Sequence, residues 1–135
     1  MDESGIVSIE SRFGVSETID RLAETVTNLG LTVFARIDHA AAATKVDMAL
    51  RPTELLIFGN PKGGTPLMQD WQIAGIDLPV KALAWEDETG KVWLSYNEAE
   101  WIAARHGLGA ASRQAVEALA RGLANVTALA AGVER

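Results

Sequence analysis

The sequence predicts an α+β fold, in which a mostly antiparallel sheet of four to five strands carries helices on one face. Several short segments alternate apolar and polar residues with a period of two, which is typical of strands. Two longer segments, one near each end, place apolar residues at helical spacing. The strands between them follow one another with few long helices, which favours antiparallel pairing. The expected order is β-α-β-β-β-β-α-α.

The first half of the chain contains one clear helix. Apolar residues recur every three or four positions across residues 15–29, with Ser16 as the expected N-cap and Gly30 at the C-terminal end. Strands are expected at residues 6–11, 31–38 and 54–58, and short helical turns at residues 39–45 and 63–71. These segments supply the first helix of the layer and three strands of the sheet.

The second half begins with a hairpin. Residues 80–86 and 91–97 flank the turn Asp87-Glu88-Thr89-Gly90, which has glycine in its last place. Asn97 and Glu100 form a capping-box pattern for the next helix, and Gly107 ends it. A long alanine-rich helix is expected at residues 111–131. Its interior Gly122 costs roughly 1 kcal/mol against alanine, so we expect close packing against a neighbour there.

The hairpin turn predicts which side chains share a face. A four-residue turn places Glu86 opposite Lys91 and fixes the rest of the register. The bulkier face is then expected to form the core; it comprises Lys81, Leu83, Trp85, Val92, Leu94 and Tyr96. The other face is expected to form a partner surface; it comprises Phe34, Ala82, Ala84 and Trp93. The alternative is that the C-terminal helix folds back over that face.

The segment Ile57-Phe58-Gly59-Asn60-Pro61-Lys62-Gly63-Gly64-Thr65-Pro66 runs from a strand directly into a turn that demands a fixed backbone path. Taken in order with Asp38-His39, Arg51-Pro52, Met68-Gln69 and Ile76-Asp77-Leu78-Pro79-Val80-Lys81, it resembles the bacterial and archaeal family called domain of unknown function 302. The resemblance covers residues 5–108 and implies a curved sheet similar to one half of the TATA-binding protein, without implying DNA binding. Residues 1–135 are expected to form one domain, with residues 109–135 as a C-terminal helical extension.

The same glycine-rich segment is a candidate anion site. Glycine-rich turns before a helix present unhindered N–H groups to phosphate or carboxylate. The match to a Walker loop fails, because Thr65 stands where its lysine should be and Lys62 lies inside the turn. A purely structural strand-to-helix corner is the favoured alternative. The candidate ligand-binding residues of this segment are Gly59, Asn60, Lys62, Gly64 and Thr65.

A second candidate is the pair Asp38-His39, in which an aspartate beside a histidine could serve acid–base chemistry. An enzyme would use His39 as general base, with Arg51, Lys81 or Tyr96 orienting substrate in one concave pocket. These three residues are also ligand-binding candidates. A structural or capping role for His39 is the favoured alternative, and His106 is expected at a helix C-terminus.

Composition narrows the function classes. The net charge of −6, from 18 acidic and 12 basic residues, opposes binding to a nucleic-acid backbone. The chain has no cysteine, only two histidines and no metal-ligand spacing, so we expect neither a metal nor a cofactor. An acidic start and the absence of a long apolar run predict a cytoplasmic protein that does not contact membranes. The leading hypothesis is a non-enzymatic homodimeric module that binds a small ligand, anions among the candidates, or a protein partner.

Overall fold

The computed structural model describes residues 4–133 and shows one five-stranded sheet in the order β1-β5-β4-β3-β2. The strands are β1 (Ile6–Ser11), β2 (Thr32–Asp38), β3 (Thr53–Gly59), β4 (Lys81–Glu86) and β5 (Val92–Asn97). Every neighbouring pair runs antiparallel. The predicted α+β class, with a mostly antiparallel sheet, is confirmed.

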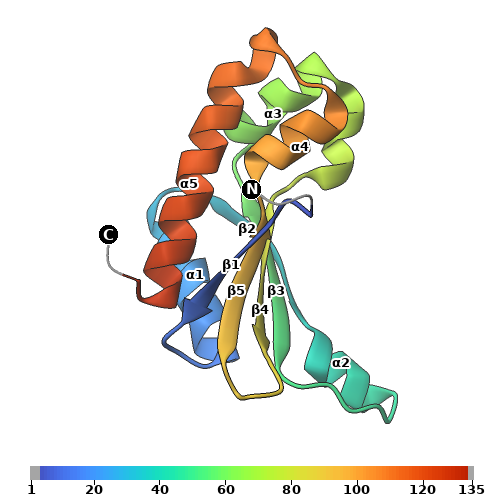
Figure 1. Ribbon diagram of the computed structural model, residues 1–135, viewed down its shortest axis with the longest axis vertical. Helices are drawn as coiled ribbons and strands as arrows, with labels where there is room; N and C mark the ends of the chain where they lie inside the picture. The colour runs from blue at the N-terminus through green and yellow to red at the C-terminus, as the bar shows by residue number, and fades with distance from the viewer. Residues whose placement is uncertain (1–3, 134–135) are drawn as a thin grey trace.

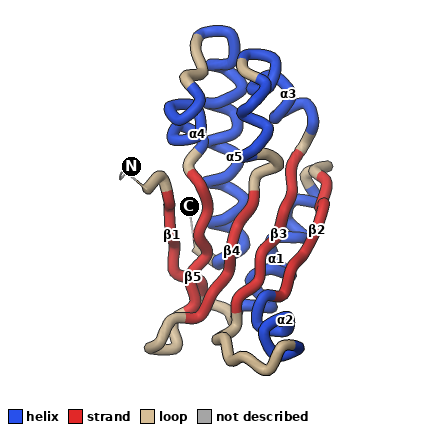
Figure 2. The backbone as a smooth tube through the Cα atoms, turned by 90° about the vertical axis from the view of Figure 1, so that its right-hand side faces the viewer, coloured by secondary structure: helices blue, strands red, loops and turns tan. Residues whose placement is uncertain are grey.

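The helices occupy three places around the sheet (Figure 1). The long helices α1 (Val15–Asn28) and α5 (Arg113–Ala131) cover one face. Beyond one end of the strands lie α3 (Pro61–Asp70), the 3-10 helices η1 (Gln72–Asp77) and η2 (Ala110–Ser112), and α4 (Ala99–His106). The short α2 (His39–Lys45) projects at the other end. Figure 2 shows that α1 and α5 lie behind the sheet, so its front face has no long helix over it.

The core lies between the sheet and the two long helices. Helix α1 buries Ile19, Leu22 and Val26 completely, because helical spacing brings these side chains onto one stripe. Helix α5 contributes Val116 and Leu123 to the same cluster. Each buried aliphatic side chain of this kind contributes roughly 2 kcal/mol by leaving water. The C-terminal helix is therefore part of the same core as the strands.

The predicted register of the β4–β5 hairpin is wrong by one residue. Glu86 pairs with Val92 and not with Lys91. The backbone N–H of Asp87 donates to the carbonyl of Lys91 over 2.8 Å, whereas the N–H of Lys91 donates to the side-chain Oδ1 of Asp87 over 3.0 Å. Gly90, with φ 89°, supplies the left-handed residue that closes a three-residue loop. The turn is thus shorter than expected, and the register moves with it.

This shift reverses the faces assigned to β4. Ala82 and Ala84, expected on the partner surface, are 1% and 0% exposed and lie beneath the helices. Helix α1 packs directly on β4, which small side chains permit. The residues expected in the core, Lys81, Leu83 and Trp85, belong to the opposite face. The assignment was right for β5, where Val92, Leu94 and Tyr96 are buried.

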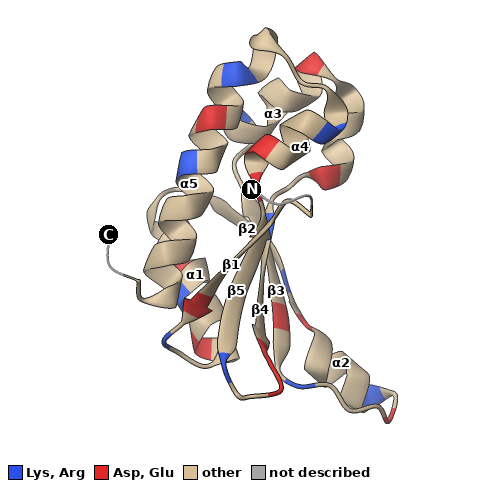
Figure 3. Ribbon diagram, viewed as in Figure 1, with Lys and Arg blue, Asp and Glu red and all other residues tan. Residues whose placement is uncertain are grey.

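The face away from α1 and α5 is apolar in its middle, and we call it the open face. The large apolar residues of this middle part are Ile37, Leu55, Ile57, Leu83, Trp85 and Trp93. Strand β5 carries no charged residue (Figure 3). The ring centroids of Trp85 and Trp93 lie 6.5 Å apart. Trp93 is on the side expected for it, and the alternative that the C-terminal helix covers that side is wrong.

Two of the predicted N-cap residues are also wrong. Helix α1 begins at Val15 with Gly14 as N-cap, so Ser16 does not cap it. Asn97 is the last residue of β5, and Glu98 is the N-cap of α4 without a side-chain hydrogen bond. The end of α4 is as expected, because Gly107 adopts the left-handed conformation with φ 63°.

Candidate functional site

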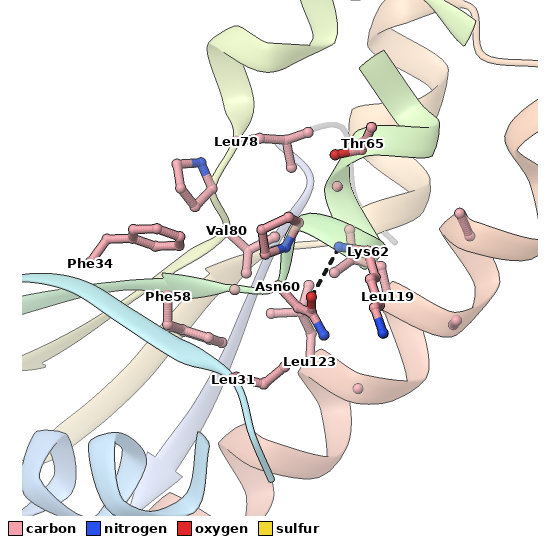
Figure 4. A pocket seen from close by; sticks show the side chains of 18 of the residues that line it. Leu31, Phe34, Phe58, Asn60, Lys62, Thr65, Leu78, Val80, Leu119 and Leu123 are labelled. Carbon is pink, nitrogen blue, oxygen red and sulfur yellow. Dashed lines mark hydrogen bonds between the residues drawn. The ribbon is translucent and has the colours of Figure 1, made fainter. Parts of the chain in front are cut away.

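A cavity of about 470 Å³ lies between the start of α3 and helix α5. Leu31 and Phe58 line one side, Val80 the middle, and Leu119 and Leu123 the side formed by α5 (Figure 4). Small-molecule sites commonly occupy about 300 to 1,000 Å³ and have mainly apolar walls. The cavity is of that size and character. It comes from segments far apart in the sequence, which the fold brings to one end of the sheet.

The glycine-rich segment forms the first turn of α3 instead of an open loop. Asn60 is the N-cap, and its Oδ1 accepts the N–H of Lys62 over 2.9 Å. The main-chain carbonyl of Asn60 accepts the N–H groups of Gly63 at 2.8 Å and Gly64 at 3.1 Å. Pro61 has no N–H to offer. The donors that a phosphate cradle requires are thus already used within the chain, and the strand-to-helix corner describes this segment.

All five candidates from this segment line the cavity: Gly59, Asn60, Lys62, Gly64 and Thr65. Among the described residues that line it, Lys62 alone has a charged side chain. Within residues 4–133 its ammonium group has no hydrogen-bond or ion-pair partner. The electrostatic character of the cavity therefore depends on one exposed cation beside apolar walls.

Helix α5 presents small residues to the cavity. Ala115, Ala118 and Gly122 lie at helical spacing along its lining side. A Cβ atom added at Gly122 would meet nothing within 4 Å. The expectation that Gly122 permits close packing against a neighbour is therefore wrong. The glycine leaves space that belongs to the cavity.

The structure separates Phe34 from Trp93, with which it was expected to share a surface. The pairing of β2 with β3 shifts between Val33 and Ala35, so Phe34 is the extra residue of a bulge. Its side chain lines the cavity and is 51% exposed. A bulge re-aims a side chain, which the period-two pattern of the sequence does not indicate.

Asp70 ties together the two helical walls of the cavity. Its carboxylate accepts hydrogen bonds from the hydroxyl of Ser112 at 2.7 Å and the N–H of Gly109 at 3.0 Å. These bonds lower the pKa of Asp70. Since Asp70 ends α3 and Ser112 immediately precedes α5, the pair fixes how these helices are spaced.

The residues proposed for an enzyme do not meet at the cavity. Asp38 is the N-cap of α2 and accepts the N–H of Ala41 at 2.9 Å, while His39 is exposed at the start of that helix. Helix α2 lies at the opposite end of the sheet from α3 (Figure 1). The capping role thus describes Asp38, and neither it nor His39 lines the cavity.

The three residues expected to assist His39 are also dispersed. Arg51 donates to the carbonyl of Glu86 at 3.1 Å. Lys81 donates to the carbonyl of Pro79 at 2.9 Å from the open side of the sheet, whereas Tyr96 is buried on the helix-covered side. Arg51, Lys81 and Tyr96 are all absent from the cavity lining. The predicted hairpin register placed Lys81 and Tyr96 on one face, but the observed register, in which Ala82 pairs with Tyr96, puts them on opposite faces.

One polar cluster was missed from the sequence. Asp77 accepts two contacts from Arg105, at 2.9 and 3.0 Å, and lies 2.6 Å from Nε2 of His106. The imidazole is only 7% exposed. The cluster joins η1 to the last turn of α4, where His106 was expected. Nothing in the sequence signals the pairing, because the residues are widely separated along the chain.

The part of the chain that the structure describes holds no group of three or more His, Asp or Glu side chains arranged to bind a metal. No helix among residues 4–133 is both long and apolar enough to cross a membrane.

A known family matches most of the chain. The family described as domain of unknown function DUF302 matches residues 7–126. The chain belongs to the DUF302 family. The match extends beyond residue 108 into α5, so it includes the part of that helix that lines the cavity.

A solved structure supports the same fold. The crystal structure of an uncharacterized conserved DUF302 protein from Bacillus stearothermophilus is similar to this DUF302 domain with a TM-score of 0.80. The likeness covers 91% of this chain and 95% of that protein, at 17% sequence identity. It shows that the two chains share their architecture.

Similar sequences occur in longer proteins. Proteins named fluoride-specific ion channel FluC 1 from Brucella suis and from Brucella abortus are each 52% identical over 130 residues. The matched region is 96% of this chain but only 51% and 48% of those proteins. The chain thus spans about half the length of the curated relatives it matches.

Proposed function

We propose that this DUF302 domain binds a small, mainly apolar ligand in the cavity between α3 and α5. The observation that carries the proposal is a cavity of about 470 Å³ that remains open beside the core, with Gly122 leaving room in its wall. A purely structural gap of this size loses packing contacts on every side. A bound apolar ligand restores them.

Binding is favoured over catalysis by the chemistry of the lining. A general acid–base site requires a titratable group in contact with the reacting atoms. Among the described lining residues only Lys62 has such a group; it is exposed and no second acid or base lines the cavity, while the amide of Asn60 already caps α3. His39, the candidate base, is outside the lining. The proposal is therefore a binding module.

The Brucella relatives are named for fluoride, but we do not propose fluoride as the ligand of this cavity. A small hydrated anion such as fluoride requires several converging donors to replace its water. The N–H groups at the start of α3 are bonded to Asn60, and the remaining lining is mainly apolar. The cavity suits a larger apolar molecule better than a bare halide.

Filling the cavity tests the proposal. In Gly122→Leu, the new side chain enters the space that the glycine leaves, so we expect at least a tenfold loss of affinity for 1-octanol. Binding is measured calorimetrically, and circular dichroism checks that the fold is kept.

The matched control is Gly122→Ala, which adds one methyl group at the same position. We expect it to retain octanol binding and to raise the free energy of unfolding by roughly 1 kcal/mol, because alanine is the better helix former. Equal octanol affinity in the wild type and in folded Gly122→Leu would contradict binding in this cavity. So would a wild-type protein that binds no octanol.

We also propose that the open face pairs with a second copy of the chain. The indole N–H of Trp85 donates to Ser95 at 2.9 Å, and that of Trp93 donates to Asp87 at 2.9 Å. Because both donors are satisfied internally, the rings offer a partner apolar surface without a polar demand. Such a surface fits an identical apolar surface related by a two-fold axis.

A further inference from the structure

We infer that the ligand of the cavity is an amphipathic monoanion, with its charged group at Lys62 and its apolar part directed toward Phe34. The inference rests on the proposed function and adds the chemical class of the ligand. It follows from the single charge at the cavity, from the placement of the aromatic residue and from the direction of helix α3.

Lys62 provides the polar end. It lies in the first turn of α3, where the helix dipole adds positive potential to that of the ammonium group. The side chain has no hydrogen-bond or ion-pair partner within residues 4–133, and no acidic residue lines the cavity. An anion is therefore attracted to this end, whereas a cationic ligand is repelled.

The rest of the cavity provides the apolar end. Figure 4 shows Phe34 and Lys62 on opposite sides, with Val80 between them. Phe34 is held out of the regular strand by the bulge in β2, and its ring lines the cavity. One charge at one side and an aromatic ring at the other favour a molecule with one anionic group and a hydrocarbon tail.

The N–H groups at the start of α3 limit the head group. Because Asn60 already accepts the N–H groups of Lys62, Gly63 and Gly64, the ligand's anion meets mainly the ammonium of Lys62. A carboxylate needs one such contact, whereas a phosphate monoester carries more charge and more acceptor oxygens than this site can satisfy. The geometry favours a carboxylate.

Octanoate and 1-octanol have the same chain length, but only octanoate is charged. Comparing their affinities therefore isolates the contribution of the charge. We expect the wild type to bind octanoate roughly fivefold more tightly than octanol, because one exposed ion pair is worth about 1 kcal/mol. Lys62→Met keeps the apolar stem and removes the charge, so it should abolish the preference while leaving octanol affinity unchanged. Lys91→Met is the matched control, since Lys91 is exposed in the β4–β5 turn away from the cavity.

The outcomes distinguish the two proposals. Tight octanol binding with no preference for octanoate, or a preference that survives in Lys62→Met, overturns the anionic class and leaves the cavity proposal intact. A wild type that binds neither compound overturns both. A preference that disappears in Lys62→Met and persists in Lys91→Met supports the inference.

Bilayer lipids also combine an anionic group with hydrocarbon tails. A vesicle experiment tests whether the ligand of the cavity is such a lipid. The net charge of −6 opposes approach to an anionic surface. We therefore expect no co-sedimentation with phosphatidylglycerol vesicles. Co-sedimentation that is lost in folded Gly122→Leu would assign the site to a bilayer lipid and overturn the inference of a free amphiphile.

Discussion

At the scale of single residues, Asp87 determines the β4–β5 turn. Its carboxylate accepts hydrogen bonds from Thr89, Trp93 and Lys91. These hydrogen bonds, those from Thr89 and Trp93 most of all, strongly lower the pKa of Asp87. Burial acts in the opposite direction but is outweighed. The depressed pKa means that the ionised carboxylate stabilises the folded state. The stabilisation is present above the unfolded pKa of about 4 and is lost as the pH falls below it.

Asp87→Asn should therefore lower the urea midpoint at pH 7, because the uncharged amide accepts these bonds less strongly. The difference from the wild type should shrink at pH 3, because the carboxylate of the unfolded wild type is then mostly protonated while that of the folded protein is still ionised. Urea unfolding of both proteins at the two pH values measures the effect. Glu88→Gln, in the same exposed turn, serves as the control. An equal difference at both pH values would contradict the role of the charge.

At the scale of secondary-structure elements, Arg36 connects β2 to β3 and α1. Burial lowers the pKa of Arg36, but hydrogen bonds to Asp20 and Glu54 outweigh this and raise it overall. Glu54 is 8% exposed and lies 2.8 Å from the guanidinium. Removal of Arg36 leaves this carboxylate without its positive partner, which is costly in a buried place.

We expect Arg36→Leu to lower the free energy of unfolding by about 2 kcal/mol, less than a fully buried pair because the arginine is 34% exposed. The double variant Arg36→Leu/Glu54→Leu should recover most of the loss, since the stranded charge is gone. Urea unfolding provides the measurement. Arg113→Leu is the control, because Arg113 and Glu100 form a pair exposed on both sides, worth about 0.5 kcal/mol. Equal losses in the two single variants would show that burial of Glu54 is unimportant.

At the scale of the whole molecule, the open face predicts a homodimer. Sedimentation equilibrium of the wild type should show a dimer. Leu83→Lys places an unpaired charge in the centre of that face and should shift the equilibrium to monomer by at least tenfold. Leu129→Lys makes the same change at an exposed site on α5 and should leave the dimer intact. A monomeric wild type, or a dimer unaffected by Leu83→Lys, would contradict the proposed interface.

The sequence by itself determined the local elements and the fold class. Periods of two and of 3.6 residues depend only on neighbours in the chain, so β1, α1 and the hairpin strands were predictable from the pattern of apolar residues. The resemblance carried by residues 57–66 in order with the segments at residues 38–39, 51–52, 68–69 and 76–81 indicated the family, which the match over residues 7–126 confirms. The glycine-rich pattern also made Gly59, Asn60, Lys62, Gly64 and Thr65 candidates, and all five line the cavity, which the sequence did not predict.

Tertiary structure decided which face each strand buries and where the cavity lies. One side-chain oxygen of Asp87 shortened the hairpin turn, and that one-residue shift moved Ala82 and Ala84 into the core. The cavity requires Phe34, Val80 and Gly122 to meet from distant parts of the chain. Such meetings depend on the packing of α5 against the sheet, a long-range contact that no local pattern encodes.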